Sequence, residues 1–445
     1  MELMVLGLVF IPLILLLIVL LTRGKAFYSS LIISSVIFLI CSIVLYLFPN
    51  ISIINFPALL WKFLSLLTVF AIFIYSIRDK HYFISILTIF QVLMLIVFEI
   101  SFAPAEPSQF LSLNRQETLL TLSGGFIIIT FMPFIAYCYR KKCGNASNKQ
   151  KRRFITGFLL LLSSFAGLMS AKSMTGLFMF WQFQYLATYF LVDSCESLHD
   201  QRMRFVPYVQ QAALTLFLAS NIIAYKGTGS LAMQNFSVGF GQASELTAVI
   251  IFMTLIIMGL LIPEYYLLRH NFFENIPISS LTGMYLVIVS IIMPYGVLLK
   301  FQPLFQNLHR GLIPLFVLYG SILVFAGAYY ALIYKQNKYS LNTTIMCIAG
   351  LGVATSFKDY QSNVDFLYSN PLSLLIVISG IVLIAAFIIE WVSYLFVQAK
   401  LPQEADEKYL PSTFFPFRVN FKLIIRLGWI TTAALILGVA LSCLR

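Results

Sequence analysis

The sequence has very little charge for its length. Of its 445 residues only 10% are charged, whereas 60% are hydrophobic, and the mean hydropathy is +0.91. Soluble domains carry about 25% charged residues, because their surface must be solvated by water. Helices whose solvent is hydrocarbon need charge only in their loops. The composition therefore excludes a large soluble domain and indicates an integral membrane protein, with the lipid bilayer as its surroundings.

Metal-binding and catalytic motifs are also lacking. The sequence has 6 cysteines and 4 histidines, without a CxxC spacing or a paired Cys/His pattern, so neither a disulfide framework nor a metal site is indicated. It contains no Walker A, HExxH, GxSxG or GxGxxG motif, and no ligand run for haem or an iron–sulfur cluster. We therefore expect no metal, no cofactor and no catalytic activity of the protein's own.

Long apolar stretches are abundant instead. About 20 apolar residues span the hydrocarbon core as one helix. The chain offers such stretches near 3–22, 27–48, 56–77, 82–103, 117–138, 154–171, 174–192, 206–225, 246–268, 279–299, 312–334, 341–356, 371–396 and 423–443. No soluble linker divides them. The sequence thus predicts an all-α fold, a polytopic transmembrane helix bundle of about fourteen spans that forms a single integral membrane domain over 1–445.

The positive charges indicate the orientation of these spans. Lys and Arg gather after the odd-numbered spans, above all in the loop 139–153, and the even-numbered loops hold few. The positive-inside rule then places the loop 139–153 in the cytoplasm and both termini outside. The net charge of +12 is explained by this topology, so we expect no nucleic acid as a partner.

Four stretches, in order, resemble the proton-translocating antiporter-like subunits of respiratory complex I and of the multisubunit cation/proton antiporters. Leu177–Val192 resembles the family's helix with a Trp-Glu pair, and Ala212–Leu231 the helix that closes with Thr-Gly-Thr-Leu. Met258–Leu286 is similar to the broken helix and its successor, with the break near Pro263. Ala331–Gly352 resembles the segment with an Asp-x-Lys before a Ser/Thr-rich helix. The resemblance thus marks an antiporter-like core over 175–355.

Most of the family's proton-relay residues are replaced. Gln182 lies where the family has its Glu, Met258 where the broken helix has its Lys, and Gly283 where the next helix has its His. Only Lys338 keeps a family charge, at the Asp-x-Lys position. Because Gln does not titrate and Met neither titrates nor bonds strongly, the resemblance implies a retained scaffold with an altered relay.

Charged residues inside predicted spans are candidates for a proton or ion path. Glu264 directly follows Pro263, and a proline that frees a carbonyl in a membrane helix usually does so beside a cavity or a packed neighbour. Glu390 lies deep in its span and Glu99 near the end of the fourth. With Lys338 and Gln182, these are the candidate path residues.

The sequence and the resemblance together favour one function and leave two alternatives. The favoured function is a membrane subunit of a multi-subunit proton- or cation-coupled complex in the bacterial inner membrane, with further membrane and soluble subunits as partners and the chemistry supplied by them. A stand-alone secondary transporter with discontinuous helices would instead carry an ion by itself. A structural membrane anchor for a soluble partner would tolerate the loss of every intramembrane charge.

Overall fold

The computed structural model describes most of the chain up to Gln306. The described residues are 2–21, 27–48, 54–55, 58–102, 109–142, 148–194, 205–229, 233, 241–260, 287–306, 319–320 and 322–323. The chain divides into two compact units, and every helix considered below lies in the first, which comprises Met1–Tyr266 and His270–Leu308. The prediction of one membrane domain with a core over 175–355 stays a prediction.

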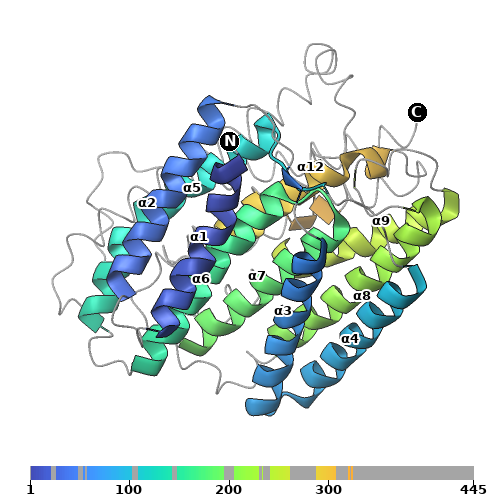
Figure 1. Cartoon of the computed structure of the whole chain (residues 1–445), viewed down its shortest axis with the longest axis horizontal. Coiled ribbons are helices and arrows are strands. Elements are labelled where there is room, and N and C mark those ends of the chain that lie inside the picture. Colours follow the sequence, from blue (N-terminus) through green and yellow to red (C-terminus); the bar gives the residue numbers. More distant parts are fainter. Residues whose placement is uncertain are drawn as a thin grey trace. The chain divides into compact units, whose positions relative to one another are not determined.

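These residues are almost entirely helical (Figure 1). The helices are α1 (Glu2–Leu21), α2 (Phe27–Leu47), α3 (Ala58–Arg78), α4 (Tyr82–Phe102), α5 (Arg115–Lys142), α6 (Asn148–Ser170), α7 (Met174–Ser194), α8 (Phe205–Thr228), α9 (Gly241–Leu255) and α12 (Met293–Gln306). Two π-helices, η3 (Ile256–Leu260) and η4 (Val287–Ile292), adjoin α9 and α12. Helices α1 to α8 coincide with the first eight predicted spans.

Length and composition allow three described helical segments to cross a membrane, namely Leu3–Leu21, Ser29–Leu47 and Gln150–Ser170. Shorter apolar segments lie at Tyr82–Phe98 and Leu246–Gly259. The helical, membrane-type character predicted from the sequence is thus confirmed for this part of the chain. The number of about fourteen spans and the outside location of the termini stay predictions.

Helix α6 lies at the centre of the unit. Its apolar segment is 94% buried, compared with 28% in α1 and 44% in α2. It packs against α1, α5 and α7, while α3 contacts α7 and α4 contacts α8. Figure 1 shows α6 and α7 between the α1–α2 pair and the α3–α4 pair. The outer faces of α1 to α4 expose apolar side chains, as expected of helices that meet lipid.

A short antiparallel strand pair, which the sequence did not predict, joins two loops at one end of the bundle. Strand β1 (Ile54–Asn55) pairs with β2 (Gln109–Leu111), and Leu111 also bridges to Ala171 between α6 and α7. The amide of Ser112 donates to the carbonyl of Ser170 at 2.8 Å. These backbone bonds fix the start of α5 against the α6–α7 turn.

Regular α-helix ends at Leu255 in the helix that the sequence predicts to be broken. The next five residues, Ile256–Leu260, form the π-helix η3. Insertions of this kind leave backbone groups out of the regular ladder and occur frequently at functional sites. Pro263, the predicted break, lies outside the described residues, so the break itself stays a prediction.

Candidate functional site

The first polar feature is a group of buried amides and hydroxyls between α4, α7 and α8, here called the interior amide cluster (Thr88, Gln91, Gln182, Gln211 and Thr215). Gln91 is its hub, because its Oε1 accepts bonds from Gln182 Nε2 at 3.1 Å and from Gln211 Nε2 at 3.0 Å. Its Nε2 donates to Thr215 Oγ1 at 2.8 Å, and Gln211 Nε2 also approaches Thr88 Oγ1 at 3.3 Å. All five residues are buried.

Two carbonyl oxygens of this cluster lack a protein partner. Gln182 Oε1 and Gln211 Oε1 are buried and accept no hydrogen bond from any residue that the structure describes. A buried unpaired polar atom is costly, and ordered water usually satisfies such atoms. The arrangement therefore favours water beside the two amides, in the interior of the bundle.

A further amide connects α7 to the π-helix. Gln184 Nε2 donates to the backbone carbonyl of Met258 at 3.1 Å. The π-helix η3 contains Met258, which is 1% exposed. Met258 thus contributes a backbone carbonyl oxygen at the position that the sequence resemblance aligns with a lysine. Only the backbone atom of this residue takes part in the polar contact.

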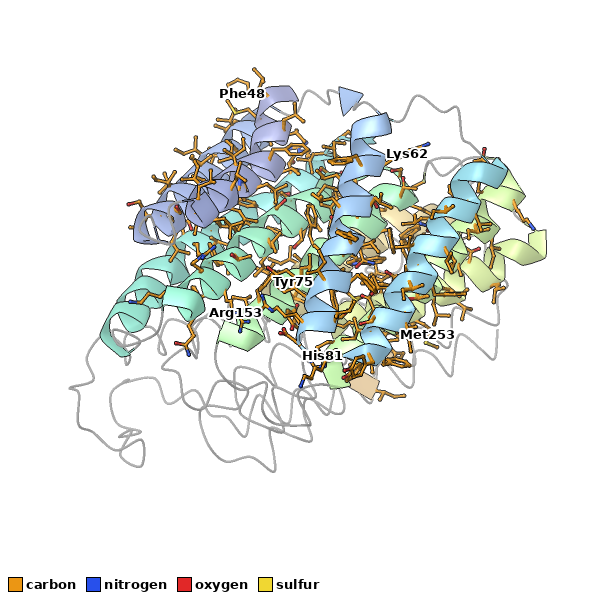
Figure 2. The ribbon with its side chains drawn as sticks, turned by 60° about the horizontal axis from the view of Figure 1, so that its bottom comes forward. Phe48, Lys62, Tyr75, His81, Arg153 and Met253 are labelled. Atoms are coloured by element: carbon orange, nitrogen blue, oxygen red, sulfur yellow. The ribbon has the colours of Figure 1, made fainter. Side chains whose placement is uncertain are left out.

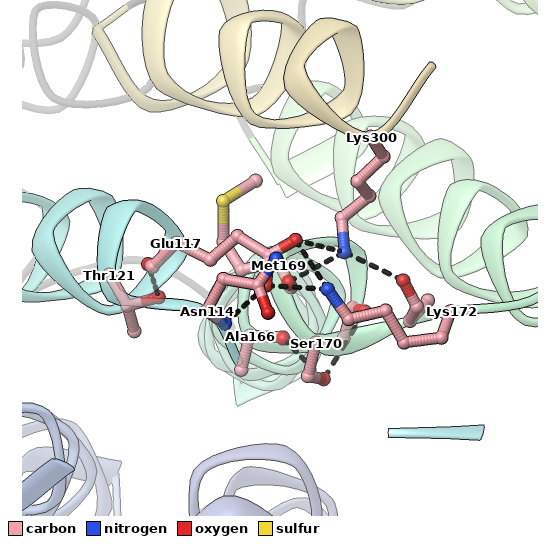
Figure 3. A network of polar contacts seen from close by, with 10 residues as sticks. Asn114, Glu117, Thr121, Ala166, Met169, Ser170, Lys172 and Lys300 are labelled. Carbon is pink, nitrogen blue, oxygen red and sulfur yellow. Dashed lines mark hydrogen bonds and ion pairs between the residues drawn. The ribbon is translucent and has the colours of Figure 1, made fainter. Parts of the chain in front are cut away.

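The second polar feature is a charged cluster at the end of the bundle that holds the strand pair (Figure 3). Lys172 Nζ lies 2.8 Å from both carboxylate oxygens of Glu117, and Lys300 Nζ lies 3.0 Å from Glu117 Oε1. The amide of Asn114 donates to Glu117 Oε2 at 2.7 Å. The side chains of Glu117 and Lys300 are only 4% and 2% exposed, and that of Lys172 is 26% exposed.

Lys300 is additionally held by the end of α6 and the turn that follows it. Its Nζ donates to the carbonyls of Met169 at 2.7 Å and Ala171 at 2.6 Å. Together with Glu117 these oxygens use all three ammonium donors. The cluster is therefore a junction between α5, α6 and α12, with two cations around one carboxylate and every donor of the buried Lys300 in use. Such a junction is suited to holding helices together.

Some of the site residues predicted from the sequence lie in the described part of the chain, and others lie outside it. Gln182 lies in the interior amide cluster. Glu99 lies in α4, but its side chain is outside the described part. Glu264, Lys338, Glu390 and the helix break at Pro263 are outside it too, so their roles stay predictions. Among the described residues, no group of three or more His, Cys, Asp or Glu is placed to hold a metal ion.

Comparison with known proteins identifies a solved structure with a similar fold. No family model matches the sequence, and no curated protein matches it. A chain in the structure titled membrane-bound sulfane sulfur reductase (MBS), an archaeal respiratory membrane complex, has a similar fold, with a TM-score of 0.51 and 16% sequence identity. The similarity covers 86% of this chain and 85% of that chain. At this identity the likeness shows the fold alone.

Proposed function

We propose that the protein is an antiporter-like membrane subunit of a multi-subunit, proton- or cation-coupled respiratory complex. The observation that carries the proposal is the position of Gln182. It lies at the place where the resembled family has a titrating Glu, and its side chain bonds Gln91, the hub of a cluster of buried amides and hydroxyls. The fold shared with a chain of an archaeal respiratory membrane complex supports the same assignment.

The chemistry of the cluster restricts what it can do. An amide neither gains nor loses a proton near neutral pH, so Gln182 cannot act as the Glu of the family does. Amides and hydroxyls can, however, order water, and a proton can move along ordered water while each molecule accepts one proton and releases another. The titrating groups must then lie elsewhere, and we propose Glu264 as the main one, with Lys338, Glu390 and Glu99 as further candidates.

Co-purification tests the assignment to a complex. When the tagged chain is extracted in a mild detergent, we expect further membrane subunits and a soluble redox protein to elute with it, and to be lost in a harsh detergent. Vesicles containing the complex should take up protons or cations, and vesicles containing the chain alone should not. Transport by the isolated chain would identify a stand-alone transporter and contradict the proposal.

Glu264 and Met258 provide a matched pair of substitutions. Because Glu264 directly follows Pro263 at the predicted helix break, which suits a proton carrier, Glu264→Gln should reduce flux by the whole complex to near the level of empty vesicles. Met258→Leu should leave the flux nearly unchanged, because Gln184 binds the backbone carbonyl of Met258 and leucine is a similar apolar side chain for a buried position. If both variants transport normally, Glu264 is only a surface charge and the carrier role is wrong.

A further inference from the structure

Helix α4 has one polar face, and that face points into the protein. His81 directly precedes the helix, and Ser85, Thr88 and Gln91 follow at steps of four, three and three residues, which aligns them along one side. All four are buried, at 7%, 7%, 0% and 0% exposure. The opposite side exposes large apolar groups: Phe83, Ile86, Phe90, Leu93 and Val97. The helix therefore turns its polar face away from lipid.

Helix α8 packs against this face and places polar side chains beside successive polar residues of α4. Tyr208 OH lies 2.9 Å from His81 Nδ1, at the start of the face. Gln211 then reaches Thr88 and Gln91, and Thr215 reaches Gln91. Ser76 of α3 adds a contact of 2.8 Å to Ser85. Hydroxyls, amides and one imidazole thus line a polar seam between α3, α4 and α8, in which successive polar residues of α4 are three or four residues apart.

The seam has the length of half a membrane. Ten residues separate His81 from Gln91, and a rise of about 1.5 Å per residue makes this about 15 Å. The hydrocarbon core is about 30 Å thick. The seam therefore leads from one end of the bundle to its middle, where Gln182 and Gln211 present the two carbonyl oxygens without a partner among the described residues.

Titratable and charged groups surround the outer end of the seam. Figure 2 shows Tyr75 and His81 at the same end of the α3–α4 hairpin, with Lys62 at the other. Asp79 accepts a hydrogen bond from Tyr189 OH, and the Tyr189 ring meets the His81 ring edge-on at 6.4 Å between centroids. Arg78 and Asp79 are 50% and 24% exposed, so solvent reaches the turn beside His81, whose own side chain is buried. The predicted topology places it in the cytoplasm.

We infer that this seam is a hydrated proton-entry path, which runs from His81 along α4 to the interior amide cluster. The inference rests on the proposed function and adds a route to it. Helix α4 lies before residue 175, so the side of the path that α4 forms is outside the region that resembles the antiporter-like family, whereas Gln182 and α8 lie within it. His81 exchanges protons with solvent, and ordered water relays them inward, each molecule accepting one and releasing one. The side chains of the seam orient this water.

A proton suits the seam better than a metal cation does. Inside the bundle the seam holds no carboxylate among the described residues, and dehydrated cations need several oxygen ligands at once. The two carbonyl oxygens without a partner among the described residues belong to amides that both bond Gln91, and such acceptors suit a water molecule, which needs two to four polar partners. The competing explanation is that the hydrogen bonds of the seam only hold the helices together. Substitutions would then lower stability without a specific loss of flux.

The experiment compares isosteric threonine substitutions in the whole complex, reconstituted into vesicles with a pH-sensitive dye and choline in place of metal cations. Thr88→Val removes the hydroxyl from the seam. Thr68→Val is the matched control, because Thr68 of α3 is buried and bonds the carbonyl of Leu64, as Thr88 bonds that of Ile84, but lies outside the seam. Gln91→Met removes the hub of the cluster.

We expect Thr88→Val and Gln91→Met to slow proton uptake by about tenfold, the rate equivalent of one lost hydrogen bond, while Thr68→Val pumps normally. If the wild-type complex moves neither protons nor, once metal cations are restored, those cations, the proposed function fails. If it moves only metal cations, or if Thr88→Val takes up protons like Thr68→Val, the path is wrong and the function stands. If the two threonine variants melt at the same temperature but differ in flux, a purely structural role of the seam is excluded. Thr88→Val decides the outcome even if Gln91→Met fails to assemble.

Discussion

Replacing Glu117 by glutamine should leave little folded protein in the membrane. The carboxylate is the shared partner of Lys172 and Lys300, and Lys300 is buried with a side chain that is 2% exposed. With glutamine at position 117 the Lys300 ammonium group stays buried beside a second cation, and only neutral oxygens, those of the two backbone carbonyls and of the glutamine amide, remain as its partners. Breaking a buried ion pair by removing one partner costs about 3–5 kcal/mol, a large fraction of the about 5–15 kcal/mol that stabilises a typical fold.

A double substitution separates the ionic effect from general damage. If buried positive charge causes the loss, Glu117→Gln combined with Lys300→Met should recover part of the melting temperature lost by Glu117→Gln alone, measured in detergent by size-exclusion chromatography after heating. Lys172→Gln should have a smaller effect than Glu117→Gln, because Lys172 is 26% exposed and its loss leaves Lys300 paired. A Glu117→Gln variant that melts like the wild type would show that the cluster contributes no stability.

The elements that were predictable are those with a long-range pattern. Helices α1 to α8 follow long apolar runs bounded by charged or polar turns, and composition alone marks such runs. The π-helix over Ile256–Leu260 and the pairing of Ile54 with Leu111 depend on one backbone insertion and on a contact between distant loops. Apolar composition is the same for an α-turn and a π-turn, so the sequence offered no signal for the π-helix. The strand pair depends on which distant loops meet, and local sequence patterns do not indicate this.

The candidate site was only partly predictable, for two different reasons. Resemblance identified Gln182, but its partner Gln91 lies 91 residues away along the chain, and only the packing of α8 against both α4 and α7 brings the amides together. The face that holds His81, Ser85, Thr88 and Gln91 does have helical spacing, and a search for buried polar faces would have found it. This face was missed because the candidates were chosen mainly among the charged residues of the predicted spans.

The charged cluster had a signal in the predicted topology. Glu117, Lys172 and Lys300 lie at the ends of predicted spans, where charges are usually solvated, and were therefore not candidates. All three adjoin even-numbered loops, however, which the positive-inside rule places on one side of the membrane. The topology thus brings the three residues to one end of the bundle. Which of them pair depends on the packing of α5, α6 and α12, which apolar periodicity does not encode.

The stability of the protein should also be highly sensitive to substitutions at the contact between α6 and α7. Membrane helices approach closely where small residues face one another, because lipid offers no hydrophobic force to drive them together. A Cβ on Gly157 would lie 2.9 Å from both the carbonyl oxygen of Ala187 and the amide nitrogen of Leu191. These are backbone atoms of α7, so no rotamer change relieves the overlap, and the two helices must separate.

Gly157→Ala should therefore destabilise the protein by about 1–3 kcal/mol or more, the usual cost of overpacking a core, and Gly157→Val should prevent folding. Gly7→Ala in α1 is the matched control. There the new Cβ would meet only side-chain atoms, Ile11 Cδ1 at 3.3 Å and Cys41 Sγ at 3.8 Å. Because alanine favours a helix over glycine by about 0.5–1 kcal/mol, Gly7→Ala should melt at or above the wild-type temperature. Equal melting temperatures for the two alanine variants would show that α6 and α7 can separate without cost, contrary to the close packing that positions Gln182.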